Sequence, residues 1–357
     1  MHHTNHLPRA GGGAAIEVHG LTKTFRGAKR QPGLLGALRS IVAPERTTKT
    51  AVEDVSFAVN HGELVALLGP NGAGKSTTIK MLTGILVPSS GEARVAGIEP
   101  YRERERNARN IGAVFGQRSQ LWWDLPVRDS FAILRDIYGV SQADHRRRLA
   151  EFDELLELSS FWDTQVRHLS LGQRVRSDLA AALLHDPPVV FLDEPTIGMD
   201  VVVKEQVRRF LQQQVEQRGV TVLLTTHDMT EVARLARRVI LINHGRIVVD
   251  GSLESIRKQI GITWQVHATL VDPADDLRLE GVKVLHRDGP RVVLAPADEA
   301  ELTPHRALKL LIERYAVADV AIVEADLEDV MRDMYLRTAA GAPQSPSSVA
   351  LSEAGEA

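Results

Sequence analysis

Gly69-Pro70-Asn71-Gly72-Ala73-Gly74-Lys75-Ser76 directly follows a fully apolar run at residues 64–68. The pattern G-x-x-x-x-G-K-[ST], placed between a buried strand and a helix, is typical of a phosphate-binding loop. Its glycines let backbone N–H groups surround phosphate oxygens, and the next helix contributes a favourable dipole. Lys75 would reach the β- and γ-phosphates, and the Ser76 hydroxyl would hold Mg²⁺. We expect a nucleoside triphosphate site here, followed by a helix over residues 79–86.

A second apolar run, residues 189–192, ends in the two carboxylates Asp193 and Glu194. An acid that ends the second strand of a P-loop ATPase orders the Mg²⁺ shell, which is the role we expect for Asp193. Glu194, one residue further, can act as a general base on the attacking water. Acid pairs at strand ends are common, so this pair supports a site only together with the loop.

Around these motifs the hydrophobic pattern predicts alternating strands and helices. Residues 16–19 alternate like an edge strand that leads into 21–25, and a further strand is expected over 52–59. The pattern between about 100 and 180 is helical, and strands at 189–192, 220–225 and 239–242 then alternate with helices at 202–217 and 230–236. Such alternation predicts a parallel sheet covered on both faces.

The chain divides into four regions, the second of which contains an insertion. Residues 1–13 are expected to form a flexible leader and 14–260 the main domain, within which 26–50 is an insertion. Residues 263–337 are expected to form a small α+β domain with strands near 264–271, 282–286, 291–295 and 319–323 and helices near 303–315 and 326–336. The tail 338–357 is rich in Ala, Ser, Pro and Gly, which favours disorder.

Composition excludes several classes of protein. The 357 residues include 43% hydrophobic and 25% charged residues, as in globular proteins, and no cysteine for disulfides or thiolate chemistry. The net charge of -3 argues against a nucleic-acid partner. The longest apolar runs have four or five residues, far short of the roughly 20 that span a bilayer. Residues 1–50 are basic and residues 263–337 acidic, which suggests different partners for the two ends.

Leu169-Ser170-Leu171-Gly172-Gln173-Arg174 resembles the LSGGQ signature of the ATP-binding subunits of ABC transporters. Leu171 replaces the middle glycine, while Ser170 and Gly172, the groups expected to touch phosphate, are in place. Ser170 would also be the N-cap of a helix over residues 173–185, and a helix N-terminus is itself an anion site. Both roles can hold together.

Further motifs of that family follow in the expected order. Phe25 resembles the aromatic residue that stacks on adenine, although the family usually has Tyr. Gln117 resembles the Q-loop glutamine, which touches Mg²⁺ and the attacking water, and Gly198-Met199-Asp200 resembles the D-loop at the dimer interface. His227 resembles the H-loop residue that contacts the γ-phosphate. The resemblance spans about residues 16–260.

The resemblance implies three sets of site residues. The catalytic set is Glu194, His227, Lys75 and Gln117, and the metal set is Ser76, Gln117 and Asp193. The ATP-binding set is Phe25, Gly69, Pro70, Asn71, Gly72, Ala73, Gly74, Lys75, Ser76, Thr77, Gln117, Ser170, Gly172, Gln173, Asp193, Asp200 and His227.

The implied fold class is α/β, a P-loop ABC-type ATPase domain with a parallel core sheet, an antiparallel edge sheet and a helical subdomain at about 100–180. The implied function is to power a membrane transporter by hydrolysing ATP, with Mg²⁺, in a head-to-tail dimer with a second ATPase subunit. The single domain, the C-terminal unit and Trp122-Trp123 resemble export-type (ABC-2) subunits, which are peripheral on the cytoplasmic face of the cell membrane and pair with integral permeases.

Several alternatives stay open. A soluble ABC-type ATPase that acts on ribosomes or nucleic acid, an importer ATPase and a non-hydrolysing regulator would share most of these motifs. Two adjacent tryptophans cannot both face one core, so at least one is expected on the surface or in a groove. The pair could form a permease-docking site or belong to the core of the helical subdomain. The insertion 26–50 could lie on anionic lipid, on a permease or on its own domain.

Overall fold

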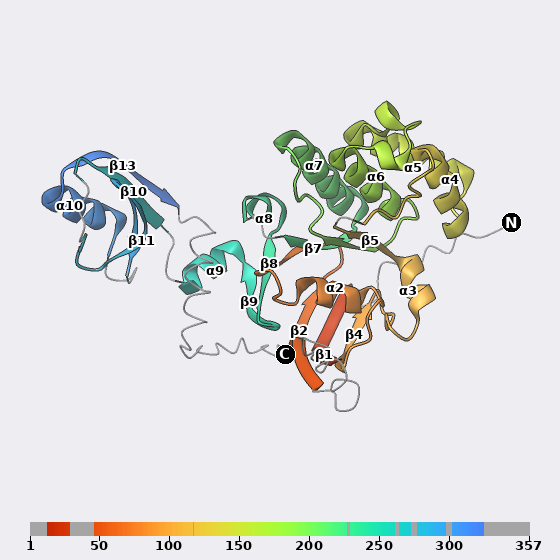
Figure 1. The fold of residues 1–357 in the computed structure, drawn as a ribbon, viewed down its shortest axis with the longest axis horizontal. Helices are drawn as coiled ribbons and strands as arrows, with labels where there is room; N and C mark the ends of the chain where they lie inside the picture. Colours follow the sequence, from red (N-terminus) through yellow and green to blue (C-terminus); the bar gives the residue numbers. More distant parts are fainter. Residues whose placement is uncertain are drawn as a thin grey trace, which may run out of the picture. The chain divides into compact units, whose positions relative to one another are not determined.

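The computed structural model describes residues 13–28, 46–116, 118–226, 229–260, 264–272, 277–297 and 302–324. Two compact units make up the chain, Met1–Leu253 and Glu254–Ala357 (Figure 1). The leader up to residue 12, residues 29–45 of the insertion, the helix expected at 326–336 and the tail 338–357 lie outside the described residues. In the described part of the chain, no helix is both long and apolar enough to cross a membrane.

A six-stranded sheet forms the centre of the first unit, in the order β5-β6-β7-β3-β8-β9. Its strands are β3 (Leu64–Leu68), β5 (Ile111–Phe115), β6 (Val189–Asp193), β7 (Thr221–Thr226), β8 (Arg238–Asn243) and β9 (Arg246–Ser252). The first five strands are parallel, and β9 runs antiparallel to β8. Every residue of β3 and β7 is buried, as expected for strands covered on both faces. The parallel sheet predicted from the alternating pattern is confirmed.

A second, antiparallel sheet has the order β2-β1-β4. It contains β1 (Ile16–Ala28), β2 (Arg46–Val59) and β4 (Ser90–Val95). Because β4 pairs with the free side of β1, the expectation of an edge strand at residues 16–19 is wrong and β1 is central. Strand β4 was not predicted, because its first half is exposed and has no apolar alternation.

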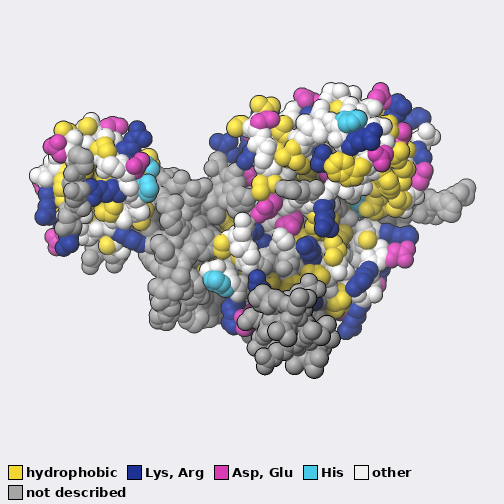
Figure 2. Space-filling view, in the orientation of Figure 1, with side chains coloured by type: hydrophobic (Ala, Val, Ile, Leu, Met, Phe, Trp, Pro, Cys, Tyr) yellow, Lys and Arg dark blue, Asp and Glu magenta, His cyan; other side chains and the backbone are white. Residues whose placement is uncertain are grey.

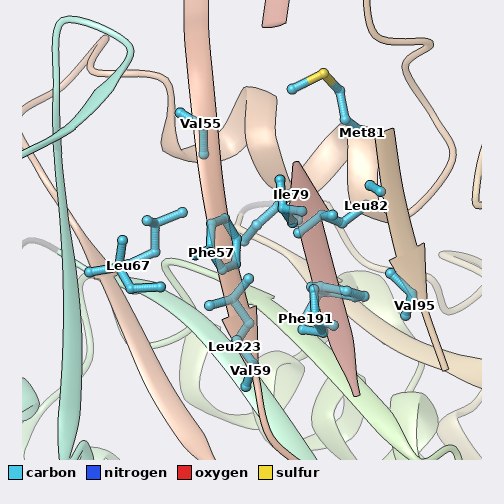
Figure 3. Packing of buried hydrophobic residues seen from close by; sticks show 14 of the residues in the cluster. Val55, Phe57, Val59, Leu67, Ile79, Met81, Leu82, Val95, Phe191 and Leu223 are labelled. Carbon is cyan, nitrogen blue, oxygen red and sulfur yellow. The ribbon is translucent and has the colours of Figure 1, made fainter. Parts of the chain in front are cut away.

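Helix α2 (Lys75–Leu82) lies between the two sheets. Its Ile79, Met81 and Leu82 pack with Phe57 of β2 and Phe191 of β6 in one buried cluster (Figure 3). The helix predicted over 79–86 is therefore displaced: it begins at the loop lysine and ends before Gly84. Gly84 has a φ of 79°, and a Cβ there would lie 2.4 Å from the Pro100 carbonyl oxygen, so the chain turns away at this glycine.

The remaining helices of the first unit are α3 (Arg104–Asn110), α4 (Val127–Tyr138), α5 (Gln142–Leu156), α6 (Leu171–Leu183), α7 (Val201–Arg218) and α8 (Met229–Leu235). In Figure 1, α4, α5 and α6 gather at one end of this unit, away from β1, β2 and β4. The helical reading of 100–180 is wrong at residues 111–115, which form strand β5 beside β6. This strand is a short apolar run of the kind whose periodicity does not separate strand from helix.

The second unit contains an antiparallel four-stranded sheet in the order β11-β12-β10-β13. Its strands are β10 (Trp264–Leu270), β11 (Val282–Asp288), β12 (Arg291–Pro296) and β13 (Val317–Glu324), and its helix is α10 (Pro304–Arg314). Leu311 of α10 and Val266 of β10 are fully buried in a shared cluster. A further helix, α9 (Leu253–Ile260), begins at the last residue of the first unit. The described strands and helix α10 match the predicted α+β elements.

Candidate functional site

The loop of residues 69–74 is pressed against the backbones of two neighbouring strands. Gly69 and Gly74 have φ of 156° and 112°, which side-chain-bearing residues rarely adopt. A Cβ on Gly69 would lie 2.2 Å from the Ile242 carbonyl oxygen of β8, and one on Gly74 would lie 2.5 Å from the Ala51 carbonyl oxygen of β2. Glycine is therefore required at both positions by lack of space as well as by conformation.

Lys75 is held inside this loop. The residue is 5% exposed, and its Nζ donates to the carbonyl oxygens of Gly69, at 2.6 Å, and Pro70, at 3.1 Å. Burial lowers the pKa of Lys75 because it penalises the charged form, while the nearby Glu194 and Asp193 act in the opposite direction. The two carbonyl contacts close the loop around the ammonium group in the position where the motif predicts phosphate binding.

Asp193 joins three segments that are far apart in the sequence. Its Oδ1 accepts from the Ser76 hydroxyl at 3.0 Å and from the Thr225 hydroxyl at 2.7 Å. Thr225 ends in the same region because β7 lies beside β6 in the parallel sheet. The structure thus brings the predicted metal residues Ser76 and Asp193 into direct contact, and it adds Thr225, which was not among the predicted site residues.

Glu194 has an unusual backbone, with a φ of 53°. Its N–H donates to the carbonyl and hydroxyl oxygens of Thr225, both at 3.0 Å. A non-glycine residue in the left-handed region is strained, and such strain persists where surrounding contacts hold it, often at functional sites. Thr225 therefore positions both acids: its hydroxyl accepts from the Glu194 N–H and donates to the Asp193 carboxylate.

These residues surround one cavity of about 400 Å³. Its lining includes the predicted residues Phe25, Asn71, Gly72, Gly74, Lys75, Ser76, Thr77, Asp193 and Glu194, together with Lys49, Ala51 and Gly116. Phe25 is 41% exposed, and the Nζ of Lys23 lies 5.4 Å from its ring centroid. An exposed aromatic face at the mouth of a phosphate-binding cavity suits stacking on a nucleobase. Lys49 was missed because it lies within the expected insertion, residues 26–50, and belongs to no motif.

The donors present suit Mg²⁺. The Ser76 hydroxyl and the Asp193 carboxylate are hard oxygen ligands, and Mg²⁺ is commonly bound through one or two carboxylates plus substrate phosphates. Among the described residues, no cluster of three or more His, Asp or Glu side chains could hold a metal ion without other ligands. The Ser76 and Asp193 donors fit a Mg²⁺ ion whose other ligands are substrate phosphates and water.

The signature residues form the beginning of α6, apart from that cavity. The Ser170 hydroxyl accepts from the Gln173 N–H at 3.2 Å, and the Gln173 side chain accepts from the Ser170 N–H at 2.9 Å, a complete capping box. The predicted N-cap role of Ser170 is confirmed, with the helix starting at Leu171. A Cβ on Gly172 would lie 3.1 Å from Val203 Cγ2, so α7 packs closely here.

Asp200 caps the neighbouring helix α7, where its Oδ1 accepts from the Val203 N–H at 2.9 Å. Leu171, the residue in place of the family glycine, is 39% exposed and lies beside Gly198, whose added Cβ would be 3.2 Å from Leu171 Cδ2. The signature and the predicted D-loop are therefore adjacent within one chain.

Two predicted site residues, Gln117 and His227, lie outside the described residues. The two tryptophans that follow Gln117 are described, with Trp122 38% and Trp123 49% exposed. The prediction that at least one lies on the surface is confirmed. On the visible face in Figure 2, basic and acidic side chains of the first unit are intermixed with hydrophobic ones.

Comparison with known proteins gives consistent matches. A family model described as ABC transporter matches residues 52–197. The probable multidrug ABC transporter ATP-binding protein YbhF of Escherichia coli is 36% identical over 61% of this chain, which spans only 38% of YbhF. The Nod factor export ATP-binding protein I of Paraburkholderia xenovorans is 40% identical over 60% of this chain and 70% of its own length. The ABC transporter ATP-binding protein NatA of Bacillus subtilis is 32% identical over 58% of this chain and 83% of its own length.

Solved structures agree in fold. The ATP-binding subunit of an ABC transporter is 28% identical, with a TM-score of 0.58, over 69% of this chain and 93% of that one. The ATP-binding cassette MJ0796, solved as a dimer in a post-hydrolysis state with ADP and phosphate, is 26% identical, with a TM-score of 0.55. The match covers 67% of this chain and 98% of that one. The predicted α/β P-loop fold is confirmed.

Proposed function

The chain belongs to the ABC transporter family, and we propose that it is the subunit that binds and hydrolyses ATP to drive a membrane exporter. The observation that carries the proposal is the single cavity in which the phosphate loop, the buried Lys75, the adjacent acids and an exposed aromatic ring meet. Its volume of about 400 Å³ is in the range of small-molecule sites.

Within this cavity the triphosphate of ATP would lie on the loop N–H groups and the N-terminus of α2, with Lys75 at the β- and γ-phosphates. Ser76 and Asp193 would hold Mg²⁺, which neutralises charge on the phosphates when bound. Glu194 would accept a proton from the attacking water, since its backbone is fixed by Thr225 at the edge of the same cavity. Phe25 would stack on adenine. For Gln117 and His227 we keep the roles implied by their motifs.

The second half of the site would come from another ATPase subunit, either an identical chain or a paralogue. Ser170, Gly172 and Gln173 lie at a helix N-terminus whose dipole favours phosphate, and Ser170 does not line the cavity of its own chain. In a head-to-tail dimer, the signature end of each chain would cover the ATP of the other, with Asp200 near the contact. ATP would then stabilise the dimer and hydrolysis would release it.

The membrane partner would be an integral permease, which we propose to be of the ABC-2 type. Two relatives have names that state multidrug transport and Nod factor export, which supports export over import. Trp122 and Trp123 supply an exposed aromatic surface a few residues after β5 in the sequence, suited to an interface. The chain would then be peripheral on the cytoplasmic face of the membrane. A soluble ATPase on ribosomes or nucleic acid is not favoured by any of these relatives.

The test combines turnover with identification of the partner. We expect Glu194→Gln to reduce ATP turnover by about 100-fold or more, since general-base catalysis contributes about 10²–10⁴-fold, while ATP affinity is kept. Glu216→Gln on α7, also a loss of one carboxylate but at an exposed position, should turn over ATP like the wild type. Tagged Glu194→Gln protein is then purified with ATP from detergent-solubilised membranes of cells that express it.

One or two polytopic membrane proteins in stoichiometric amount are the expected co-purified partners. Ribosomal proteins or nucleic acid, with no membrane protein, would contradict the transporter assignment. Turnover by Glu194→Gln at the wild-type rate would contradict the assignment of the base independently of any partner.

A further inference from the structure

One face of helix α6 carries Ser170, Arg174 and Asp178 at intervals of four residues. Residues four apart on an α-helix lie one above the other on the same side. Ser170 is the N-cap, so this face connects the signature to the buried middle of the helix. Arg174 and Asp178 both contact segment 118–123, which begins directly after Gln117 in the sequence.

Asp178 holds the first part of this segment. It is 3% exposed, and its Oδ1 accepts from the Ser119 hydroxyl at 2.9 Å and from the Gln120 N–H at 3.1 Å. The Gln120 side-chain amide donates to the Asp178 carbonyl oxygen at 2.9 Å. Ser119 Oγ in turn accepts from the Leu121 N–H at 3.1 Å. A buried carboxylate is costly unless it is hydrogen-bonded, and both hydrogen bonds that Asp178 Oδ1 accepts come from this one short segment.

Arg174 contacts the second part of the segment, one helical turn nearer to Ser170. Its guanidinium carbon lies 4.7 Å from the ring centroid of Trp123, a cation–π contact. Because residues 119 and 120 contact Asp178 and residue 123 contacts Arg174, the segment runs along α6 towards the end that carries the signature. The tryptophans are also fixed from elsewhere, because the Trp122 N–H donates to Ser130 Oγ and the Trp123 carbonyl accepts from the Arg167 N–H.

We propose that Asp178, assisted by Arg174, is a positioning residue that fixes segment 118–123 to α6, so that the tryptophan surface and Ser170 move as one rigid piece. This inference rests on the proposed function, in which the tryptophans meet a permease and Ser170 completes a partner's ATP site. Asp178 would then act on catalysis only through Ser170, without touching nucleotide. Neither residue belongs to the cavity that holds ATP.

The first test measures amide hydrogen exchange of segment 118–123 in the full chain without nucleotide. Asp178→Ala removes the acceptor for Ser119 and Gln120, so exchange should accelerate by about tenfold or more, as expected for loss of a hydrogen bond to a charged group. Asp178→Asn keeps an acceptor oxygen in the same place and should restore most of the protection. Ser177→Ala is the matched control, because Ser177 is buried next to Asp178 but donates only to the Gln173 carbonyl within α6.

The second test uses the Glu194→Gln background, in which ATP should accumulate the dimer. Adding Asp178→Ala should weaken ATP-driven dimerisation by about tenfold, while the affinity of the monomer for ATP stays within about twofold. Asp178→Asn should recover dimerisation.

Unchanged exchange in Asp178→Ala, or the same acceleration in Ser177→Ala, would overturn the inference. An equal loss of monomer ATP affinity and dimerisation would also overturn it, since it would show a general structural role. If the parent chain neither hydrolysed ATP nor dimerised with it, the proposed function would fail, and the exchange experiment would still decide whether Asp178 fixes the segment.

Discussion

The two halves of the proposed ATP site, both in the first unit, are built in opposite ways. At the phosphate loop, glycine backbones are pressed against β2 and β8, and Lys75 is buried with its ammonium on two loop carbonyls. At the start of α6, Ser170 and Gln173 hydrogen-bond to each other, and Leu171 is partly exposed. One half is a shaped cavity and the other is an exposed helix end.

From this difference we expect that the first half can bind ligand alone and the second cannot. In the cavity the fold already holds the donors in place, so ligand binding loses little conformational entropy. A capped helix N-terminus offers a dipole and N–H groups, but nothing around it excludes water. The comparison predicts that substitutions in the first half affect ATP affinity and those in the second affect assembly.

The largest expected effect separates ATP affinity from dimer assembly. Lys75→Ala should reduce the affinity of the monomer for ATP by about 100-fold or more, because a buried cation at the phosphates is removed. Ser170→Ala should leave that affinity within about twofold and should cost about 1 kcal/mol of stability through loss of the helix cap. Titration of a fluorescent ATP analogue at low protein concentration measures the affinities. If Ser170→Ala weakened binding to the monomer as strongly as Lys75→Ala, the two halves would not be independent.

A second experiment asks how rigid the cavity half is. Gly74→Ala should lower the free energy of unfolding by about 2–3 kcal/mol, because its Cβ would meet the Ala51 carbonyl oxygen and its φ of 112° is unfavourable for alanine. Gly72→Ala is the matched control, because Gly72 has a φ of 83° but no atom within 4 Å of an added Cβ, so about 1 kcal/mol is expected. Urea unfolding measures both. Equal losses would mean that close contact does not define the loop.

A third experiment concerns the connection from α6 to segment 118–123. Burial raises the pKa of Asp178 to about 7, although the Ser119 and Gln120 hydrogen bonds and the Arg174 charge oppose the shift. Between the ordinary carboxyl pKa near 4 and this value, the folded chain binds a proton that the unfolded chain does not, so the Asp178 contribution to stability is lost as pH rises through about 7.

The measurement compares wild type with Asp178→Asn, in which this titration is absent. Between pH 5 and pH 8, the wild type should lose about 2 kcal/mol of unfolding free energy relative to the variant, from urea unfolding at each pH. Other titrating groups cancel in the difference. A difference that is independent of pH would show that Asp178 does not titrate in this range.

The smallest expected effect is at the mouth of the cavity. Phe25→Ala should weaken ATP binding by about fivefold, because an aromatic stacking contact is lost, while Phe25→Tyr should keep it. Inorganic triphosphate, which has no base to stack, provides the control in the same competition assay and should bind both variants like the wild type. A parallel loss for triphosphate would place the effect of Phe25 on the loop instead of on the base.

Sequence alone was sufficient where a residue's role is local. The loop of residues 69–76, the strand that ends at Asp193 and the cap at Ser170 were each predictable, because their patterns specify backbone geometry within a few residues. What failed depended on distant partners. Strand β1 became central only because β4 pairs with it, and β5 was hidden in a helical stretch because five apolar residues fit either element.

The same limit applies within the site. Thr225, Lys49 and Asp178 belong to no motif, and each gains its role from a neighbour more than 20 residues away in the sequence. The left-handed backbone of Glu194 is imposed by Thr225 on the next strand, so no local pattern could reveal it. By contrast, an aspartate directly before the apolar residues 179–183 of α6 is a signal that could have marked Asp178.

The backbone of Glu194 has a consequence for how this chain can change over generations. Because Glu194 has a φ of 53°, its replacement by glycine would relieve backbone strain and stabilise the fold. The same replacement would remove the proposed base. Stability and turnover therefore select different residues at position 194. In a lineage that no longer needs to hydrolyse ATP, a substitution of this residue would stabilise the fold at no cost to function. The residue at position 194 should therefore indicate whether a homologue still hydrolyses ATP.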